Sequence, residues 1–81
     1  MENHMEINEF INNFADQFDD TTVDDLSPET VFHELDDYSS IVALSIIAMI
    51  DEEYGVALTG NEMKAAVTIQ DLFNTVQAKI A

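Results

Sequence analysis

Hydrophobic side chains recur at helical spacing near both ends of the chain. The positions are Ile7, Phe10, Ile11, Phe14 and Phe18 in the first stretch and Ile69, Leu72, Phe73, Val76 and Ile80 in the last. Neighbouring positions in each set are one, three or four residues apart, which places them on one face of a helix. This spacing predicts a first helix over about residues 4–18 and a last helix that follows Thr68.

Both ends of the last helix carry further signals. Thr68 is a suitable N-cap, and Asp71 stands three residues later, as in a capping box. Lys79 falls in the final turn, where a positive charge is favourable beside the negative end of the helix dipole.

The centre of the chain holds an apolar run, Ile41–Ile50, interrupted by Ser45. It predicts a helix from residue 39 or 40 to Tyr54, with Gly55 as the left-handed residue that ends it. The run is too short to span a bilayer. A helix that is apolar on nearly every side cannot be enclosed completely in so small a protein, so part of it is expected to meet a partner.

A long acidic connection, residues 19–39, lies between the first and second main helices. Ser27-Pro28-Glu29 within it predicts the N-cap and first two positions of a short helical turn. Another short helix is expected at residues 61–66, after a turn at Gly60. The expected fold is all-α: a single domain over residues 1–81 with three main helices, one or two short helices and this long loop.

The charge balance excludes several partners. Two Lys and Arg residues stand against 17 Asp and Glu residues, for a net charge of −15. So few cations cannot neutralise a run of phosphates, which argues against nucleic-acid binding, and anionic membrane surfaces are disfavoured for the same reason. With 47% hydrophobic residues, five Phe and two Tyr, the chain nevertheless has the core material that disordered chains lack.

Cysteine usage and the first residues bear on the compartment. The chain has no Cys, and therefore no disulfide, thiolate metal site or thiol redox chemistry. Its first residues, Met1 to Glu6, are acidic and lack the basic start and apolar run of a signal peptide. A monomer in the cytoplasm, without membrane insertion, is expected.

Catalytic and metal sites are poorly supported. A nucleophilic serine needs a base, and the only histidines are His4 and His33, neither of which the sequence places beside a serine. Calcium-loop alignments that start at Asp16 or Asp20 lack the glycine at position 6 and the glutamate at position 12. Neither an enzyme nor a dedicated metal site is expected.

Two adjacent serines, Ser39 and Ser40, stand where the long connection enters the second main helix. Ser39 can act as the N-cap, which leaves the hydroxyl of Ser40 facing outward in the first turn. A phosphodiester attached there would lie at the positive end of the helix dipole. On these physical grounds alone, capping without modification is the simpler interpretation.

At these residues the sequence resembles the acyl carrier protein family, over essentially the whole chain. Members of that family are small acidic helical bundles whose second helix begins with Asp-Ser-Leu and ends in an acidic cluster, an aromatic residue and a glycine. The serine of that motif carries 4′-phosphopantetheine. The matching segments here are Ser27 to Leu35 before the motif, Asp51 to Val56 after it, and Val67 to Leu72 at the last helix.

The motif itself reads Ser39-Ser40-Ile41 in place of Asp-Ser-Leu. Counting back from Tyr54-Gly55 without a gap places Ser40 at the modified serine, whereas counting forward from Phe32 selects Ser39. Ser40 is preferred, because a loop accommodates an extra residue, while an insertion in a packed helix rotates every later side chain by about 100°. Val42 and Ser45 leave the first half of this helix without the carboxylates typical of the family.

The resemblance implies a protein that catalyses nothing itself. A phosphopantetheinyl transferase would move 4′-phosphopantetheine from coenzyme A to Ser40, and the arm would hold acyl intermediates as thioesters in fatty-acid, polyketide-like or other specialised acyl biosynthesis. The other partners implied are acyl-processing enzymes with basic docking patches. Apolar residues of the second helix, with Tyr54 and Phe73, would line a cleft for the acyl chain, although core packing is the simpler interpretation of each.

Two other functions stay open. One is a carrier-like fold that is not modified and acts as an acidic protein-interaction module, which the departures at Ser39 and Ile41 favour. The other is a peptidyl carrier domain, which the strong acidity disfavours because such carriers are typically less charged. An unrelated acidic bundle that imitates nucleic acid is more remote.

Overall fold

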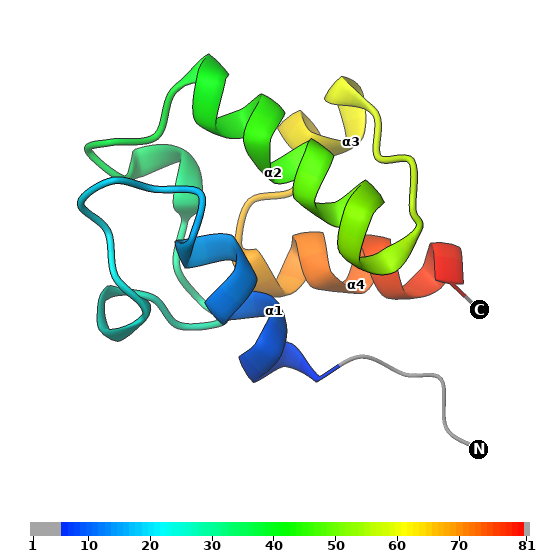
Figure 1. The fold of residues 1–81 in the computed structure, drawn as a ribbon, viewed down its shortest axis with the longest axis horizontal. Coiled ribbons are helices and arrows are strands. Elements are labelled where there is room, and N and C mark those ends of the chain that lie inside the picture. The colour runs from blue at the N-terminus through cyan, green and yellow to red at the C-terminus, as the bar shows by residue number, and fades with distance from the viewer. Residues whose placement is uncertain (1–5, 81) are drawn as a thin grey trace.

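Four α-helices and two short 3-10 helices make up the part of the chain that the computed structural model describes, residues 6–80 (Figure 1). In chain order they are α1 (Ile7–Ala15), η1 (Val23–Asp25), η2 (Phe32–Glu34), α2 (Ser40–Tyr54), α3 (Gly60–Ala65) and α4 (Ile69–Ile80). The extended contacts among residues 6–80 are limited to one isolated antiparallel bridge, between Val31 and Thr68. The expected all-α class is confirmed. None of the helices described is both long and apolar enough to cross a membrane.

The first helix is shorter than its hydrophobic pattern predicts. It ends at Ala15 instead of residue 18, because the next two turns close through i to i+3 hydrogen bonds. The N–H of Gln17 donates to the carbonyl of Phe14 (3.1 Å), and that of Phe18 to Ala15 (3.0 Å). This tighter turn still brings Phe18 into the core, where 7% of its surface is exposed. Residues 4 and 5 of the expected helix, and His4 with them, lie outside the described residues.

Aromatic side chains from α1 form the centre of the core. Phe10 and Phe14 are fully buried. The Phe10 ring lies 5.4 Å from Phe73 of α4 and 5.9 Å from Tyr54 at the end of α2. The Phe14 ring lies 5.5 Å from Phe32 of η2, in an edge-on arrangement. The apolar face of α1 thus contacts α2, α4 and the long connection at once.

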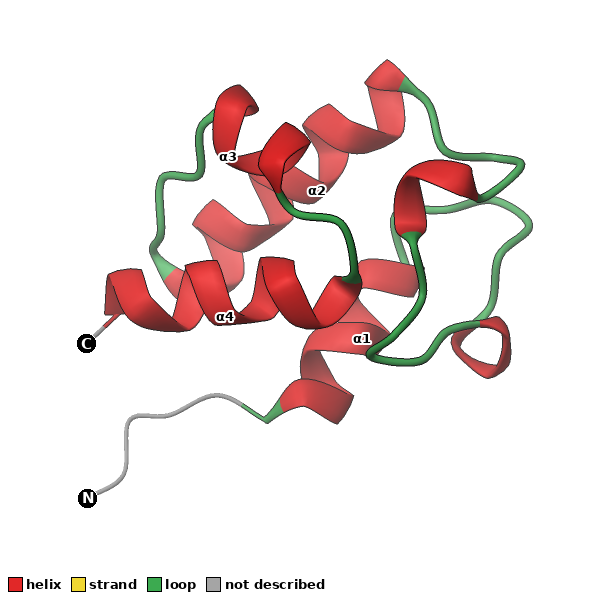
Figure 2. Cartoon of the chain, turned by 180° about the vertical axis from the view of Figure 1, so that it is seen from behind, coloured by secondary structure: helices red, strands yellow, loops and turns green. Residues whose placement is uncertain are grey.

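The connection between α1 and α2 wraps one side of the bundle (Figure 2). The predicted helical turn at 27–29 is wrong: Thr30 closes a turn on the carbonyl of Ser27 (3.1 Å), and the helical turn begins later, at Phe32. The reason is tertiary. The first amides of α4 need acceptors, and Gln70 and Ile69 donate to the carbonyls of Pro28 (2.9 Å) and Thr30 (3.1 Å). Those carbonyls are therefore directed at α4 and not into a helix of their own.

The two ends of this connection are joined by Asp37. Its carboxylate accepts hydrogen bonds from the backbone N–H groups of Asp20 (3.1 Å) and Thr21 (3.0 Å), and from the Thr21 hydroxyl. The Thr21 hydroxyl and these backbone groups lower the pKa of Asp37, because they favour the ionised form. The chain is therefore held in place just before it enters α2.

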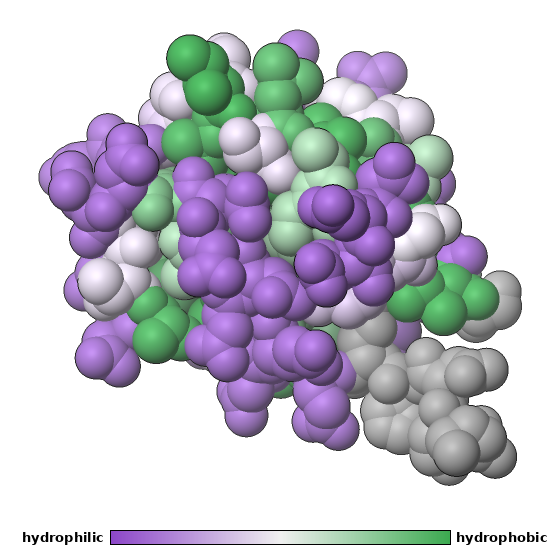
Figure 3. Space-filling model, in the orientation of Figure 1, coloured by the Kyte–Doolittle hydropathy of each residue, from purple (hydrophilic) through white to green (hydrophobic). Residues whose placement is uncertain are grey.

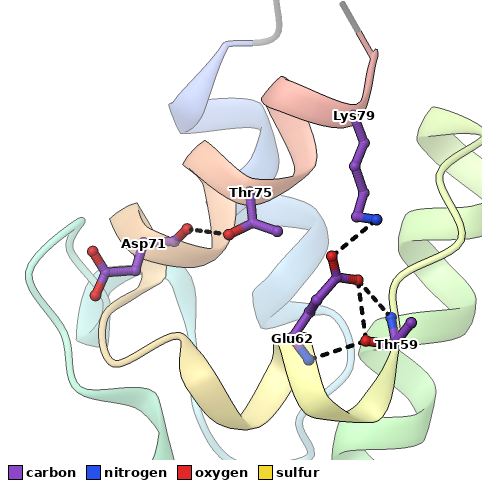
Figure 4. A network of polar contacts seen from close by, with 5 residues as sticks. All are labelled: Thr59, Glu62, Asp71, Thr75 and Lys79. Atoms are coloured by element: carbon purple, nitrogen blue, oxygen red, sulfur yellow. Dashed lines mark hydrogen bonds and ion pairs between the residues drawn. The ribbon is translucent and has the colours of Figure 1, made fainter.

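Polar contacts of Glu62 cap the start of α3 and attach this helix to α4 (Figure 4). Thr59 is its N-cap: the Thr59 hydroxyl accepts from the N–H of Glu62 (3.1 Å), and the Glu62 carboxylate accepts from the N–H of Thr59 (3.0 Å). Lys79 of α4 lies 2.9 Å from the same carboxylate. These contacts lower the pKa of Glu62. With Thr59 as N-cap, the predicted short helix starts one residue earlier than residue 61.

The start of α4 is capped as the sequence predicts. Asp71 N–H donates to the Thr68 hydroxyl, and Thr68 N–H donates to the Asp71 carboxylate, each at 3.1 Å. Lys79 lies in the last turn of α4, as expected, and its ammonium group also forms an ion pair with Glu62 of α3. The helix therefore has a favourable group at each end.

Replacing Asp37 with asparagine should destabilise the protein by a few degrees at pH 7. A carboxyl whose pKa is lowered by folding stabilises the native state above its ordinary pKa of about 3.9, and that contribution is lost as the pH falls through the folded-state pKa. The matched control is Asp36→Asn, which removes the same charge from an exposed neighbour. In thermal unfolding from pH 7 to 2.5, Asp37→Asn should melt below Asp36→Asn at neutral pH, and the two should converge below pH 4. Equal melting points at pH 7 would contradict the role of Asp37.

Loss of the α3 cap should be measurable as well. Thr59→Ala is expected to lower the free energy of unfolding by about 1 kcal/mol, the usual cost of an N-cap. For a domain of this size that is about 4–8 °C in melting temperature. Thr75→Ala is the control, since its hydroxyl bonds only the carbonyl of Asp71 within α4 (3.1 Å), and it should change stability by less than about 0.5 kcal/mol. Equal losses in the two variants would show that the Thr59 cap contributes nothing.

Candidate functional site

The two serines at the start of α2 have different surroundings. Ser39 is the N-cap, in extended conformation, and its hydroxyl accepts a hydrogen bond from the N–H of Val42 (3.2 Å). Ser40 is the first residue of the helix and is exposed. Its hydroxyl has no hydrogen-bond partner among residues 6–80. The expected capping role of Ser39 is confirmed, and it leaves the Ser40 hydroxyl without a structural role.

An aromatic cluster fixes the backbone that leads into these serines. The Tyr38 ring lies 5.6 Å from Phe32, and the His33 ring lies 4.2 Å from Phe32 and 5.2 Å from Tyr38. Phe32 is fully buried, so it anchors the cluster in the core. Burial raises the pKa of the Tyr38 phenol. Together with the Asp37 contacts, this packing orients the first turn of α2.

The second helix divides its apolar surface among three directions. Ile46, Met49 and Ile50 face the core and are at most 6% exposed. A second stripe contains the positions Ser40, Ala43, Leu44 and Ile47. Ile41 points to solvent and is 77% exposed. The run that is apolar on nearly every side is therefore one core face plus two faces that the bundle leaves accessible.

The stripe that begins at Ser40 forms one wall of a groove of about 440 Å³. The opposite walls come from α3 and from the segment around η2. The lining residues are His33, Tyr38, Ser40, Ala43, Leu44, Ile47, Gly60, Met63 and Lys64. Most of these side chains are apolar, and no Asp or Glu is among them. In a chain of net charge −15, an open groove without a carboxylate is a marked local exception.

Catalytic chemistry does not follow from this groove. His33 and Ser40 both line it, but no hydrogen bond between them is present, and no carboxylate of the lining can orient the imidazole. A nucleophile, a base and an orienting group are needed together. Among the residues described, no three His, Asp or Glu side chains gather closely enough to hold a metal ion.

Tyr54 and Phe73, expected as cleft residues, do not line the groove. Phe73 is 6% exposed and packs edge-on against Phe10. Tyr54 lies at the far end of α2, where its hydroxyl accepts a hydrogen bond from the Asn13 amide (3.0 Å). Core packing, the simpler interpretation, holds for both.

The sequence did not predict that α3, His33 and Tyr38 would line a groove beside Ser40. Gly60, Met63 and Lys64 belong to a short helix whose position depends on its contacts with α4. The one local signal was the Thr59 and Glu62 capping box, which identifies where α3 begins. Nothing in the local sequence indicates that α3 faces Ser40.

Comparison with known proteins identifies the family. Residues 8–76 match the family described as "Phosphopantetheine attachment site". No curated protein and no solved structure gives a significant match. Domains of this family hold 4′-phosphopantetheine covalently and carry intermediates without catalysing a reaction themselves. Because the match spans most of its length, the chain belongs to the phosphopantetheine attachment family of carrier domains.

Proposed function

We propose that this protein is an acyl carrier protein in which Ser40 bears the 4′-phosphopantetheine arm, within one carrier domain that spans residues 1–81. The observation that carries the proposal is the division of roles between the two serines. Ser39 uses its hydroxyl to cap α2, while the exposed hydroxyl of Ser40 opens onto the groove. A hydroxyl that must be modified has to be accessible and dispensable for the fold, and Ser40 meets both conditions.

The surroundings of Ser40 suit the arm chemically. The phosphodiester would be an anion, and the adjoining groove contains no carboxylate to repel it. The arm would supply the thiol that holds an acyl group as a thioester, since the chain itself has no Cys. The apolar lining from Ala43, Leu44, Ile47 and Met63 would shelter part of a bound acyl chain from water.

The surface around Ser40 supports docking of client enzymes. Ile41 and Leu44 are 77% and 66% exposed, and Figure 3 shows hydrophobic surface along the first part of α2 with hydrophilic surface over the loops beside it. Asp36 and Asp51, both exposed, flank this apolar patch along the chain. Negative charge around an apolar centre suits partners with basic docking patches, which it attracts from a distance and binds weakly.

The proposed carrier function implies a set of partner enzymes. We infer that the carrier works as a monomer in the cytoplasm with a phosphopantetheinyl transferase and acyl-processing enzymes of fatty-acid, polyketide-like or other specialised acyl biosynthesis. The first half of α2 carries no charge. It therefore favours dedicated client enzymes that bind through apolar contacts, and it disfavours client enzymes that need a carboxylate beside the modified serine. An unmodified interaction module is the second candidate, because Ser39 stands where the family has an aspartate.

Intact mass after incubation with coenzyme A and a broad-specificity phosphopantetheinyl transferase tests the attachment site. Wild type should gain the mass of one arm, and Ser40→Ala should gain none. Ser39→Thr keeps the N-cap hydroxyl and should be modified like wild type. Ser39→Ala loses about 1 kcal/mol of stability with the cap and should still be modified.

Two results would contradict the assignment. An unmodified wild type under these conditions favours the interaction module. Modification that persists in Ser40→Ala and disappears in both Ser39 variants would move the site to Ser39.

Ile41 provides a test of the apolar docking patch. Ile41→Asn should slow modification by the transferase about tenfold, as expected for the loss of one apolar anchor at an interface. The melting temperature should stay the same, because Ile41 is 77% exposed. Val67→Asn is the matched control: Val67 is 52% exposed but lies between α3 and α4. Equal rates for the two variants would show that the patch takes no part in docking.

A further inference from the structure

The two lysines of the chain have different environments. Lys79 of α4 forms an ion pair with Glu62, with 2.9 Å between the charged atoms. Lys64 of α3 lines the groove that Ser40 opens onto, and among residues 6–80 it forms no ion pair. One of the two cations in a chain with 17 carboxylates is thus placed in a groove whose lining contains no carboxylate.

The direction of Lys64 follows from the packing of α3. Glu62 faces α4, where Lys79 and the Thr59 cap engage its carboxylate. Met63, the next residue, is 3% exposed and packs into the core. Lys64 is two residues beyond Glu62 and is therefore rotated by about 200° around the helix, which turns it from α4 toward the groove. The carboxylate closest to it in sequence already has partners, so it does not compete for Lys64.

We propose that Lys64 is the counter-ion of the phosphodiester at Ser40, a positioning residue that directs the root of the arm along the groove. The proposal rests on the attachment of the arm at Ser40. His33, on the wall formed by the segment around η2, lines the other side of the same space. In the modified protein, the phosphodiester at Ser40 would be an anion beside this groove. Lys64 is the lysine that lines the groove and can pair with it.

The strength of this contact should be modest. Lys64 is exposed, and exposed ion pairs are partly screened by water and salt. A pair of this kind favours one arrangement by about two- to fivefold. That bias keeps the arm near the apolar lining while leaving it free to swing out to a client enzyme, as a carrier requires.

The experiment compares the arm-bearing forms of wild type, Lys64→Gln, Lys64→Arg and Asn8→Asp. Each is driven to complete modification with excess transferase and checked by intact mass. The direct measurement is the phosphorus NMR relaxation of the phosphodiester, and the second is the difference in melting temperature between modified and unmodified protein. Lys64→Arg keeps the charge in the groove, and Asn8→Asp changes the net charge by the same one unit at an exposed position of α1, outside the groove.

The expected result is a more mobile phosphorus in Lys64→Gln, with wild-type values in Lys64→Arg and Asn8→Asp. Modification should also lower the melting temperature by about 2–8 °C more in Lys64→Gln than in wild type. Salt at 1 M should make wild type resemble Lys64→Gln, since screening then acts within about 3 Å.

The outcomes separate this inference from the proposed function. A fully modified Lys64→Gln with wild-type phosphorus relaxation overturns the role of Lys64 and leaves the carrier function intact. An equal effect from Asn8→Asp also overturns it, because overall charge would then be the cause. If wild type does not gain the mass of the arm, the proposed carrier function is wrong, and the counter-ion role of Lys64 is wrong as well.

Discussion

Burial of Phe32 is the contact on which the geometry of the site depends. This side chain is fully enclosed, with its ring 5.5 Å from Phe14 of α1 and 5.6 Å from Tyr38. It therefore joins the helix that begins the bundle to the residue that precedes the serine pair. Without this anchor, the end of the long acidic connection would keep only the partly buried Leu35 and Tyr38 as apolar contacts with the core, and the first turn of α2 would be less firmly oriented.

Charge is distributed so that attraction and attachment use different surfaces. Most of the acidic residues lie on the connection and at the end of α2, where all but Asp37 are exposed, and they create a long-range negative field. The groove beside Ser40 contains no carboxylate and does contain Lys64. A carrier needs both properties, because its partners are attracted by the acidic surface, whereas its own arm is an anion that the same surface would repel.

The main helices could be predicted from the sequence because their signals are local. The limits of α2 followed from a serine N-cap and a terminal glycine, and Gly55 does adopt the left-handed conformation, with φ 67°. The capping box of Thr68 and Asp71 was predicted for the same reason. The conformation of the segment at Pro28 could not be predicted in this way, because its carbonyls accept hydrogen bonds from α4, which lies far away in the sequence.

The sequence by itself determined the helical class, the acidic surface and the serine pair, since spacing, composition and capping act within a few residues. Tertiary structure alone decided which apolar side chains of α2 are enclosed and that Met63 and Lys64 line the same groove as Ser40. The physical reason is that a helix with apolar residues on all sides has no preferred inward face until its neighbours pack against it. Packing of α1 against α2 helps to select that face, and α3, which packs against α4, supplies a wall of the groove on another side of α2.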